Sequence, residues 1–480
     1  MLLFGRKVPP PVTYAMGTFF DKFFSIVTIP LMASAMTPAM YGQYDVVLAL
    51  SAALMAIMGL GLSDTLVRFA TVNSNDAEQR RCAAELLGAA CVLVAAGGVL
   101  TQIWAPSFIK IFNLSISLTA LRWTLAATVV WGLMEFTLAW VRIKDRAGLY
   151  ASISVARTLA AVAVTWTALL MGWGADGVLT GNALAGLIFC AGLLAHQIRE
   201  TGIGISREAF RQIAVYGVPL IGAGLTAFAM SGLNRFFLPS AASYDEIGAF
   251  SLASRLSQAI WPFTAPFILW WYPKRIPVLL EPHGAQRSAD MWGIGVSILI
   301  LSCIALALMG PLFINLMFPP AYARATVFLP AALGLMALTQ LPNMTNAGVY
   351  ARDTTLWALG IEVVAALVAV MGYLLLIPTW GIAGSIVALG IAFSLRVFLY
   401  VIAGNRLHHI PYNFGAAAIA MAVGIVLVWL APSPDYMLAR FVWSVLAGCA
   451  LIALILHLKL IKLPDSVLAS LFGALKFGQR

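Results

Sequence analysis

The chain has 480 residues, of which 61% are hydrophobic and 10% are charged, and its mean hydropathy is +0.93. Soluble domains carry roughly 25% charged residues, so this composition excludes an ordinary soluble protein and indicates an integral membrane protein. The formal net charge of +10 could indicate an acidic partner such as nucleic acid, and the positions of the basic residues decide whether it does.

Apolar runs recur along nearly the whole chain, and most of them reach the roughly 20 residues that a helix needs to cross about 30 Å of hydrocarbon. The runs are continuously apolar, which favours helices over the short, two-faced strands of a membrane barrel. No small-residue cleavage site follows the first run, so we expect a retained helix and not a signal peptide. Clusters of Pro, Gly and charge separate fourteen expected spans: residues 12–36, 44–69, 82–104, 116–140, 149–172, 177–197, 211–237, 246–272, 291–317, 326–349, 356–377, 381–403, 413–431 and 437–458.

The basic residues are distributed unevenly between the two sides of the membrane. By this assignment twenty of the 29 Lys and Arg residues lie on the side of the N-terminus and only three on the opposite side. Cytoplasmic loops are enriched in Lys and Arg, so both termini are expected in the cytoplasm. The net charge is then mainly a consequence of topology, and nucleic acid is not an expected partner.

An internal repeat relates the two halves of the chain. Two pairs of segments align at offsets of 206 and 207 residues: YGQYDVVLAL (41–50) with IGAFSLASRL (247–256), and GADGVLTGNALAG (174–186) with GIAGSIVALGIAF (381–393). The first alignment pairs Gly42 with Gly248, and the second pairs Gly174 with Gly381. Because the offset spans an even number of helices, the halves are expected to have the same orientation about an axis along the membrane normal.

The repeat predicts an all-α polytopic membrane protein of about fourteen helices, built from two six-helix lobes and two C-terminal helices. The expected organisation is an N-terminal lobe (1–197), a cytoplasmic linker (198–210), a C-terminal lobe (211–404), and two extra helices with a cytoplasmic tail (405–480).

The first span carries a polar stripe. Thr18, Asp21, Lys22, Ser25 and Thr28 follow a helical spacing and fall on one face. Lipid offers no hydrogen-bond partner, so this face must look into the bundle or into water. Either Asp21 and Lys22 form a buried structural pair with neighbouring helices, or they border a hydrated cavity; we favour the cavity.

Three arginines lie within other spans toward their middle or outer parts: Arg122, Arg235 and Arg255. Arg255 lies about two turns into its helix, too deep to extend easily to the interface, and Arg122 is at intermediate depth. A position in the cavity is therefore predicted for both. Arg235 could instead extend to the outer interface.

Two more arginines, Arg157 and Arg396, lie within spans toward the cytoplasmic side. Acidic residues lie at comparable depth, namely Glu135, Glu362 and Asp64. We expect structural pairing between these arginines and acids.

Catalytic patterns are scarce. The sequence contains no HExxH, GxSxG or Walker motif, and the five cysteines lie in or at the ends of apolar spans without CxxC spacing. The loops on the outer side are too short to hold a catalytic domain. We therefore expect no enzyme activity, no cofactor, no metal site and no disulfide framework.

Several segments resemble polysaccharide transporters of the multidrug/oligosaccharidyl-lipid/polysaccharide flippase superfamily. The resemblance runs from about residue 14 to 405 through glycine, proline and aromatic patterns in four segments: TPAMYGQYDVVLALSAALMAIMGLGLSDTLVRFA, RIKDRAGLYASISVARTLAAV, VYGVPLIGAGLTAFAMSGLNRFFL and EIGAFSLASRLSQ. It implies two six-helix lobes around a central cavity, in the bacterial cytoplasmic (inner) membrane, and export of an undecaprenyl-diphosphate-linked oligosaccharide for surface polysaccharide synthesis.

The interior charges agree with that function. A diphosphate is anionic, so a cavity with a surplus of Lys and Arg complements it. We expect substrate contacts from Lys22, Arg122, Arg235 and Arg255, and Asp21 is a candidate for ion coupling. The lipid bilayer is an expected partner, and a polysaccharide polymerase and glycosyltransferases are further candidates.

Two alternatives remain open from the sequence. A multidrug antiporter of the same superfamily would share the architecture but would prefer acidic residues in its cavity. A membrane scaffold of a polysaccharide-synthesis complex would need no charge in a cavity.

Overall fold

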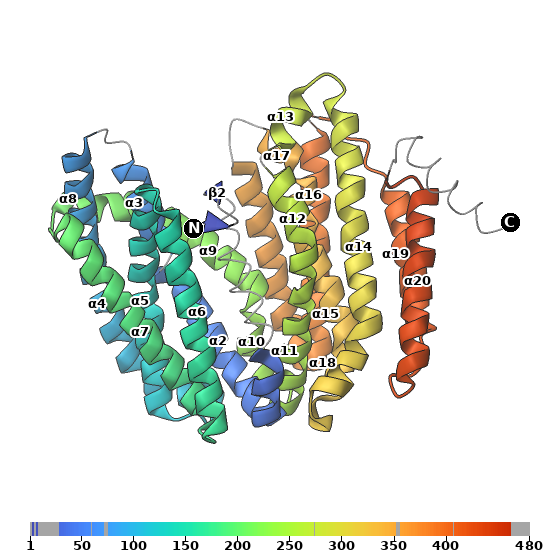
Figure 1. Cartoon of the computed structure of the whole chain (residues 1–480), viewed down its shortest axis with the longest axis horizontal. Coiled ribbons are helices and arrows are strands. Elements are labelled where there is room, and N and C mark those ends of the chain that lie inside the picture. Colours follow the sequence, from blue (N-terminus) through green and yellow to red (C-terminus); the bar gives the residue numbers. More distant parts are fainter. Residues whose placement is uncertain are drawn as a thin grey trace. The chain divides into compact units, whose positions relative to one another are not determined.

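The computed structural model describes residues 28–461 apart from 59, 72–74, 273, 352–355 and 407, together with two short strands near the N-terminus. The strands β1 (Leu2–Leu3) and β2 (Arg6–Lys7) pair antiparallel. The rest of the described chain is helices and loops (Figure 1). It divides into two compact units, residues 1–252 with 366–388 and residues 253–365 with 389–480.

The first unit contains most of the helices from the N-terminal part of the chain. They are α2 (Pro38–Met58), α3 (Leu60–Ala70), α4 (Asp76–Phe112), α5 (Leu118–Ile143), α6 (Ala147–Leu170), α7 (Gly174–Thr201), α8 (Arg207–Gln212), the π-helical η1 (Ile213–Gly217), α9 (Val218–Ser231), α10 (Asn234–Phe237), the 3₁₀ turn η2 (Leu238–Ser240), the first part of α11 (Tyr244–Ser257) and the middle of α18 (Leu356–Asn405).

Helix α5 lies at the centre of the first unit and packs against α2, α3, α4 and α7. Its side chains Phe136 and Trp140 are 1% exposed and belong to the main apolar cluster. Small residues let the backbones approach closely: a Cβ on Gly132 would lie 2.4 Å from the carbonyl oxygen of Met58. Close packing at small residues is a usual source of helix association in lipid.

Helix α18 is a hairpin with two arms. Its backbone is non-helical at Gly381, where φ is +56°, and a Cβ on Gly372 would lie 2.6 Å from the Cβ of Ala388 on the returning arm. Gly174, which the repeat aligns with Gly381, has φ of +57° at the turn between α6 and α7. Glycine adopts this left-handed conformation without a Cβ clash, so the second alignment has a structural counterpart.

The second unit contains the remaining helices. They are the end of α11, the 3₁₀ turn η3 (Gln258–Ile260), α12 (Trp261–Trp271), α13 (Arg275–Leu280), α14 (Gly284–Met317), the 3₁₀ turn η4 (Pro320–Tyr322), α15 (Ala325–Gln340), α16 (Pro342–Thr345), α17 (Ala347–Tyr350), both ends of α18, α19 (Phe414–Trp429) and α20 (Met437–His457).

Two buried arginines hold parts of the second unit together. Arg440 of α20 donates to the carbonyl oxygen of Leu308 in α14 at 2.8 Å, which fastens the last helix pair to α14. Arg275 is 3% exposed and donates to Asn346 Oδ1 at 2.7 Å. Its guanidinium also lies 3.6 Å from the centre of the Tyr272 ring, a cation–π contact.

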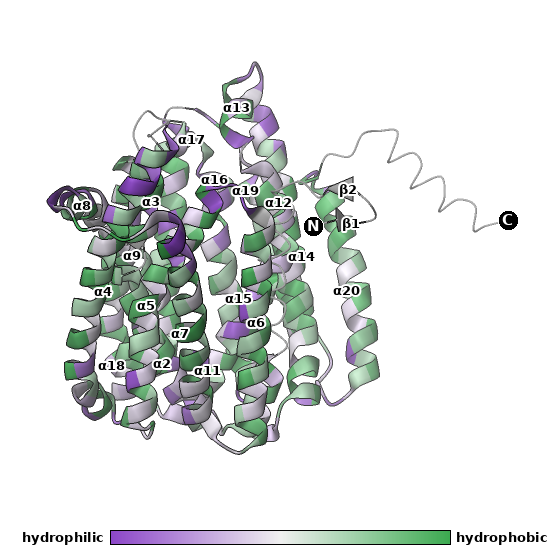
Figure 2. Cartoon of the chain, turned by 60° about the vertical axis from the view of Figure 1, so that its left-hand side comes forward, coloured by the Kyte–Doolittle hydropathy of each residue, from purple (hydrophilic) through white to green (hydrophobic). Residues whose placement is uncertain are grey.

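The protein is a multi-pass membrane protein. Nine helices in the described part of the chain are long and apolar enough to cross a membrane, and the bent pair Arg207–Gly217 and Leu220–Ser231 could form a tenth span. In Figure 2 the long helices are green over most of their length, and hydrophilic residues gather at helix ends, around α8 and α13. A helix suits such a chain because it satisfies the hydrogen bonds of its backbone within its own segment, and lipid offers no other partners.

Every expected span from 44–69 onward corresponds to helical structure, although several are broken into shorter pieces. Residues 12–27 of the first expected span lie outside the described residues. The number fourteen and the lobe boundaries, residues 1–197, 198–210, 211–404 and 405–480, stay predictions.

Candidate functional site

A buried ion pair joins α2 to α10 within the first unit. Asp45 of α2 is 5% exposed, and its Oδ2 accepts a hydrogen bond from Arg235 Nε of α10 at 2.7 Å. The same oxygen accepts from Ser251 Oγ of α11 at 2.7 Å. We call Asp45, Arg235 and Ser251 the Asp45 clasp.

The clasp continues into a network of uncharged side chains. Arg235 also donates to the carbonyl oxygen of Ser231 and to Asn234 Oδ1, both at 3.1 Å. Asn234 donates in turn to Ser385 Oγ of α18 at 2.8 Å, and both residues are fully buried. A buried charge is tolerated when its hydrogen bonds are satisfied, and this network provides them from five helices, α2, α9, α10, α11 and α18.

The backbones of α2 and α11 touch beside the clasp. A Cβ on Gly42 would lie 2.3 Å from the carbonyl oxygen of Tyr244, and a Cβ on Gly248 would lie 1.9 Å from the carbonyl oxygen of Pro38. No larger residue fits either position without separating the helices. The repeat aligns Gly42 with Gly248 and places Asp45 opposite Ser251, so helices from the two predicted halves meet at equivalent residues, as expected beside an axis of internal symmetry.

A second backbone contact joins α3 to η1. A Cβ on Gly61 of α3 would lie 2.9 Å from the Cα of Gly217, the last residue of the π-helical η1. Beside it the rings of Phe69 and Tyr216 pack edge to face with centres 6.0 Å apart. The chain bends by 41° after Gly217, and π-helical turns frequently mark functional positions.

The predicted site residues fall in different places. Arg235 does not extend to an interface: its side chain is 17% exposed and paired with Asp45, which corrects the alternative raised from the sequence. Arg122 lies in a groove between α4 and α5. Arg255 is half-buried on α11, in the second unit. Asp21 and Lys22 lie outside the described residues.

The pairing of Asp45 with Arg235 could hardly be predicted from the sequence. Asp45 and Arg235 are 190 positions apart, and each is a lone charge in an apolar surrounding. The only available signal was their similar depth at the outer end of two expected spans, where opposite charges can neutralise each other.

Of the two arginines expected to form structural pairs, Arg396 does so. Its NH2 lies 2.8 Å from Glu362 Oε1, and Tyr400 donates to the same oxygen at 2.9 Å, so the predicted pairing is confirmed for Arg396. The guanidinium of Arg157 lies over the Trp131 ring, 4.6 Å from its centre.

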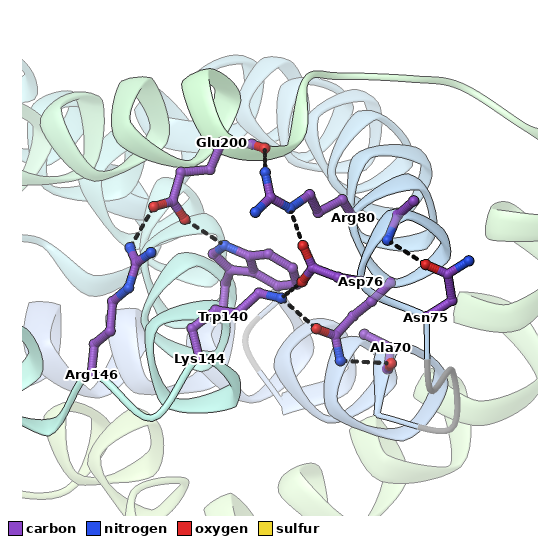
Figure 3. Close-up of polar contacts among 10 residues, drawn as sticks. Ala70, Asn75, Asp76, Arg80, Trp140, Lys144, Arg146 and Glu200 are labelled. Carbon is purple, nitrogen blue, oxygen red and sulfur yellow. Dashed lines mark hydrogen bonds and ion pairs between the residues drawn. The ribbon is translucent and has the colours of Figure 1, made fainter.

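A group of mostly charged residues also connects the start of α4 with the ends of α5 and α7 (Figure 3). Arg146 pairs with Glu200, and the other carboxylate oxygen of Glu200 accepts from Trp140 Nε1 at 3.0 Å. Asp76 pairs with Arg80 at 2.8 Å and with Lys144. We call these six residues the α4–α5–α7 network; it ties together three helices of the first unit.

His, Cys, Asp and Glu are the residue types that commonly bind metal ions in proteins. In the described segments no group of three or more such residues is placed to hold a metal ion.

Comparison with known proteins identifies the family. The sequence profile of the polysaccharide biosynthesis proteins matches residues 12–274, more than half of the 480-residue chain. The chain belongs to this family. A search of curated protein sequences found no match to this chain.

Several solved structures share the fold of this chain. The lipid II flippase MurJ in an inward closed conformation has a TM-score of 0.75 at 10% identity, covering 93% of this chain and 99% of MurJ. A multidrug resistance transporter of the MATE family and MOP superfamily, inward-facing, has a TM-score of 0.59 at 16% identity, covering 84% and 96%. An outward-facing MATE structure has a TM-score of 0.56 at 15% identity, covering 83% and 94%. The chain shares its fold with these flippase and transporter structures.

Proposed function

We propose that this protein moves an undecaprenyl-diphosphate-linked oligosaccharide from the cytoplasmic to the outer leaflet of the bacterial inner membrane, for surface polysaccharide synthesis. The observation that carries the proposal is the family membership combined with a fold shared over 93% of the chain with a lipid II flippase. Both termini are cytoplasmic in this proposal, in line with the distribution of Lys and Arg.

The mechanism is alternating access between the two predicted halves. Helices α2 and α3 touch segments of the second half at two points, the Asp45 clasp with its glycines and the Gly61–Gly217 contact. A head group can pass only if these contacts open in turn. The bend after Gly217 is the proposed hinge at the cytoplasmic end.

The diphosphate of the substrate acts on the clasp by competition. An arginine fork binds phosphate oxygens at least as well as a carboxylate, so a diphosphate reaching Arg235 can replace Asp45 as its partner. Loss of the Asp45 bond then frees α2 from α10 and favours opening toward the outside. Lys22 and Arg255 remain proposed contacts for the same anion, and Asp21 a proposed ion-coupling residue.

Transport is tested with purified protein in vesicles that contain a fluorescent undecaprenyl-diphosphate oligosaccharide. We expect the protein to expose the labelled head group to an impermeant quencher on the opposite leaflet, and the Arg235→Gln variant to be inactive. Arg324→Gln, a change at an exposed arginine of an interhelical loop, should stay active. Absence of flipping by the wild-type protein would contradict the proposal.

Cells depleted of the protein provide a second test. Flipping predicts that the lipid-linked oligosaccharide accumulates on the cytoplasmic leaflet. Export of cationic dyes without any such accumulation would favour the multidrug antiporter. Loss of polymer with a normal distribution of the lipid-linked sugar between leaflets would favour the scaffold, which would also explain a requirement for polymerase and glycosyltransferase partners.

A further inference from the structure

The groove that contains Arg122 has the features of a lipid site. It runs between α4 and α5 of the first unit and has a volume of about 640 Å³. Arg122 lies at one end with Gln102 and Thr119, and the walls below are apolar down to Leu133. The Gln102 side chain donates to the carbonyl oxygen of Arg122 at 3.0 Å, which joins the two helices at this level.

Arg122 is exposed and lacks a counter-charge within the described residues. No acidic side chain of that part of the chain lies within ion-pair distance of its guanidinium. The carboxylate of Asp176, at the same end of the helices, accepts instead from the backbone N–H of Ser117 at 3.1 and 3.2 Å. Lys110 in the last turn of α4 adds a second exposed positive charge. This end of the groove therefore attracts an anion.

The surroundings of the groove face lipid. Apolar side chains beside it on α4 are widely exposed, with Val99 at 61% and Ile103 at 67%. Trp104 and Trp123 are 59% and 41% exposed, and tryptophan is enriched where the hydrocarbon meets the head groups. The two tryptophans therefore favour a position of Arg122 near the lipid head groups.

The length of the groove matches one leaflet. Arg122 and Leu133 are eleven residues apart on α5, which corresponds to about 16 Å at the rise of a helix. One leaflet contributes about half of the roughly 30 Å hydrocarbon core. Small residues leave room along this path: a Cβ on Gly98, which lines the groove, would have no atom within 4 Å.

We propose that this groove binds an anionic phospholipid of the membrane, with its phosphate at Arg122 and one acyl chain along α4 and α5. The leaflet is the one that faces the α4–α5 loop, the outer leaflet in the predicted topology. The site is separate from the proposed transport path, since it needs neither the Asp45 clasp nor a lipid-linked sugar. Phospholipid is the committed occupant because the groove opens to bulk lipid and is as long as one leaflet.

The test measures lipid retained by the purified full-length protein in native mass spectrometry. Dioleoyl-phosphatidylglycerol and dioleoyl-phosphatidylcholine are compared, because they share acyl chains and differ in charge. We expect the wild type to prefer phosphatidylglycerol, and Arg122→Gln to reduce that preference about fivefold, the effect of one basic side chain at an anionic surface. Arg122→Lys should keep the preference, and the control Arg324→Gln should not change it.

A second variant tests the acyl-chain path without altering charge. Gly98→Phe fills the groove from a position with free space around it, so we expect one fewer retained lipid of either kind per chain. Gly448→Phe on α20, where a Cβ also meets no atom within 4 Å, is the matched control and should retain lipid as the wild type does. Melting curves of all variants verify that they are folded.

Three results would overturn the inference. The first is an unchanged preference in Arg122→Gln, and the second is unchanged retention in Gly98→Phe. The third is displacement of phosphatidylglycerol by an equal concentration of undecaprenyl diphosphate, which would assign the groove to a prenyl lipid.

Discussion

The Asp45 clasp and the α4–α5–α7 network use the same kinds of side chain in different surroundings. In the clasp the Arg235 and Asp45 side chains are 17% and 7% exposed, whereas Arg146 and Glu200 of the network are 42% and 22% exposed. Removing one partner of a buried pair costs about 3–5 kcal/mol because the other charge is left buried. Surface pairs contribute about 0–1 kcal/mol. Burial, and not the number of ion pairs, therefore decides which region matters energetically.

The two regions also differ in what they connect. The network joins α4, α5 and α7, all from the predicted first half, and so holds one half together. The clasp joins α2 to α10 and α11 of the predicted second half. The costly interaction thus lies where alternating access requires helices to separate.

Replacing Asp45 by Asn should have the largest effect. The change leaves the Arg235 guanidinium buried without its counter-charge, so we expect the free energy of unfolding to fall by about 3–5 kcal/mol. Titration of the purified protein with a denaturing detergent measures it. The double variant Asp45→Asn/Arg235→Gln is the control, and removing both charges should recover much of the loss. A loss below about 1 kcal/mol would mean that the clasp stabilises the protein no more than a surface ion pair does.

Glu362→Gln should have an intermediate effect, and it tests whether the loss of stability follows the burial of the ion pair. Arg396 is 20% exposed, between Arg235 and Arg146, whereas Glu362 is 24% exposed, close to Glu200. We expect a loss of about 1.5–3 kcal/mol, as for hydrogen bonds to charged groups, in the same titration. An effect as large as that of Asp45→Asn would mean that burial does not explain the ranking.

Gly248→Ala tests the backbone contact beside the clasp. The new Cβ would lie 1.9 Å from the carbonyl oxygen of Pro38, and forced separation of packed elements costs about 1–3 kcal/mol. The matched control is Gly222→Ala on α9, where a Cβ meets no atom within 4 Å; it should gain about 0.5–1 kcal/mol from better helix propensity. Equal stability of the two variants would argue against a close contact at Gly248.

Glu200→Gln should have the smallest effect. Its ion pair with Arg146 is partly exposed, and the remaining amide oxygen can still accept from Trp140, so we expect a loss of about 1 kcal/mol or less. Salt distinguishes it from the clasp: raising the salt concentration from about 0.05 M to about 0.5 M should shrink this loss by screening while leaving that of Asp45→Asn nearly unchanged. A loss insensitive to salt would place Glu200 in a buried environment.

Much of the fold could be predicted from local sequence. Apolar runs predicted helical structure in each expected span from 44–69 onward, because a helix in lipid satisfies its backbone hydrogen bonds within its own segment. The pairing of Arg396 with Glu362 was also predictable, since both lie at one depth in adjacent spans that form the α18 hairpin. The breaks at η1 and η3 within expected spans were not, because prolines and glycines in membrane helices do not reveal which of them bend.

The candidate site could be predicted only in part. Arg235 was recognised as unusual, yet its partner Asp45 was not. Arg122 lies in a groove between α4 and α5, and its predicted contact with the substrate stays a prediction. A lone charge in an apolar run shows that a polar partner must exist. It does not identify the partner, because contacts between distant helices depend on how their faces pack.

The sequence by itself determined the solvent in which this protein folds and the segments that become helices, because both follow from the apolar content of about 20 neighbouring residues. The tertiary structure decided which charges are neutralised. Asp45 meets Arg235 across 190 positions because glycines at 42 and 248 let α2 and α11 touch. In the part of the chain that the structure describes, no acidic side chain reaches Arg122, because the groove beside it is lined by small and apolar residues.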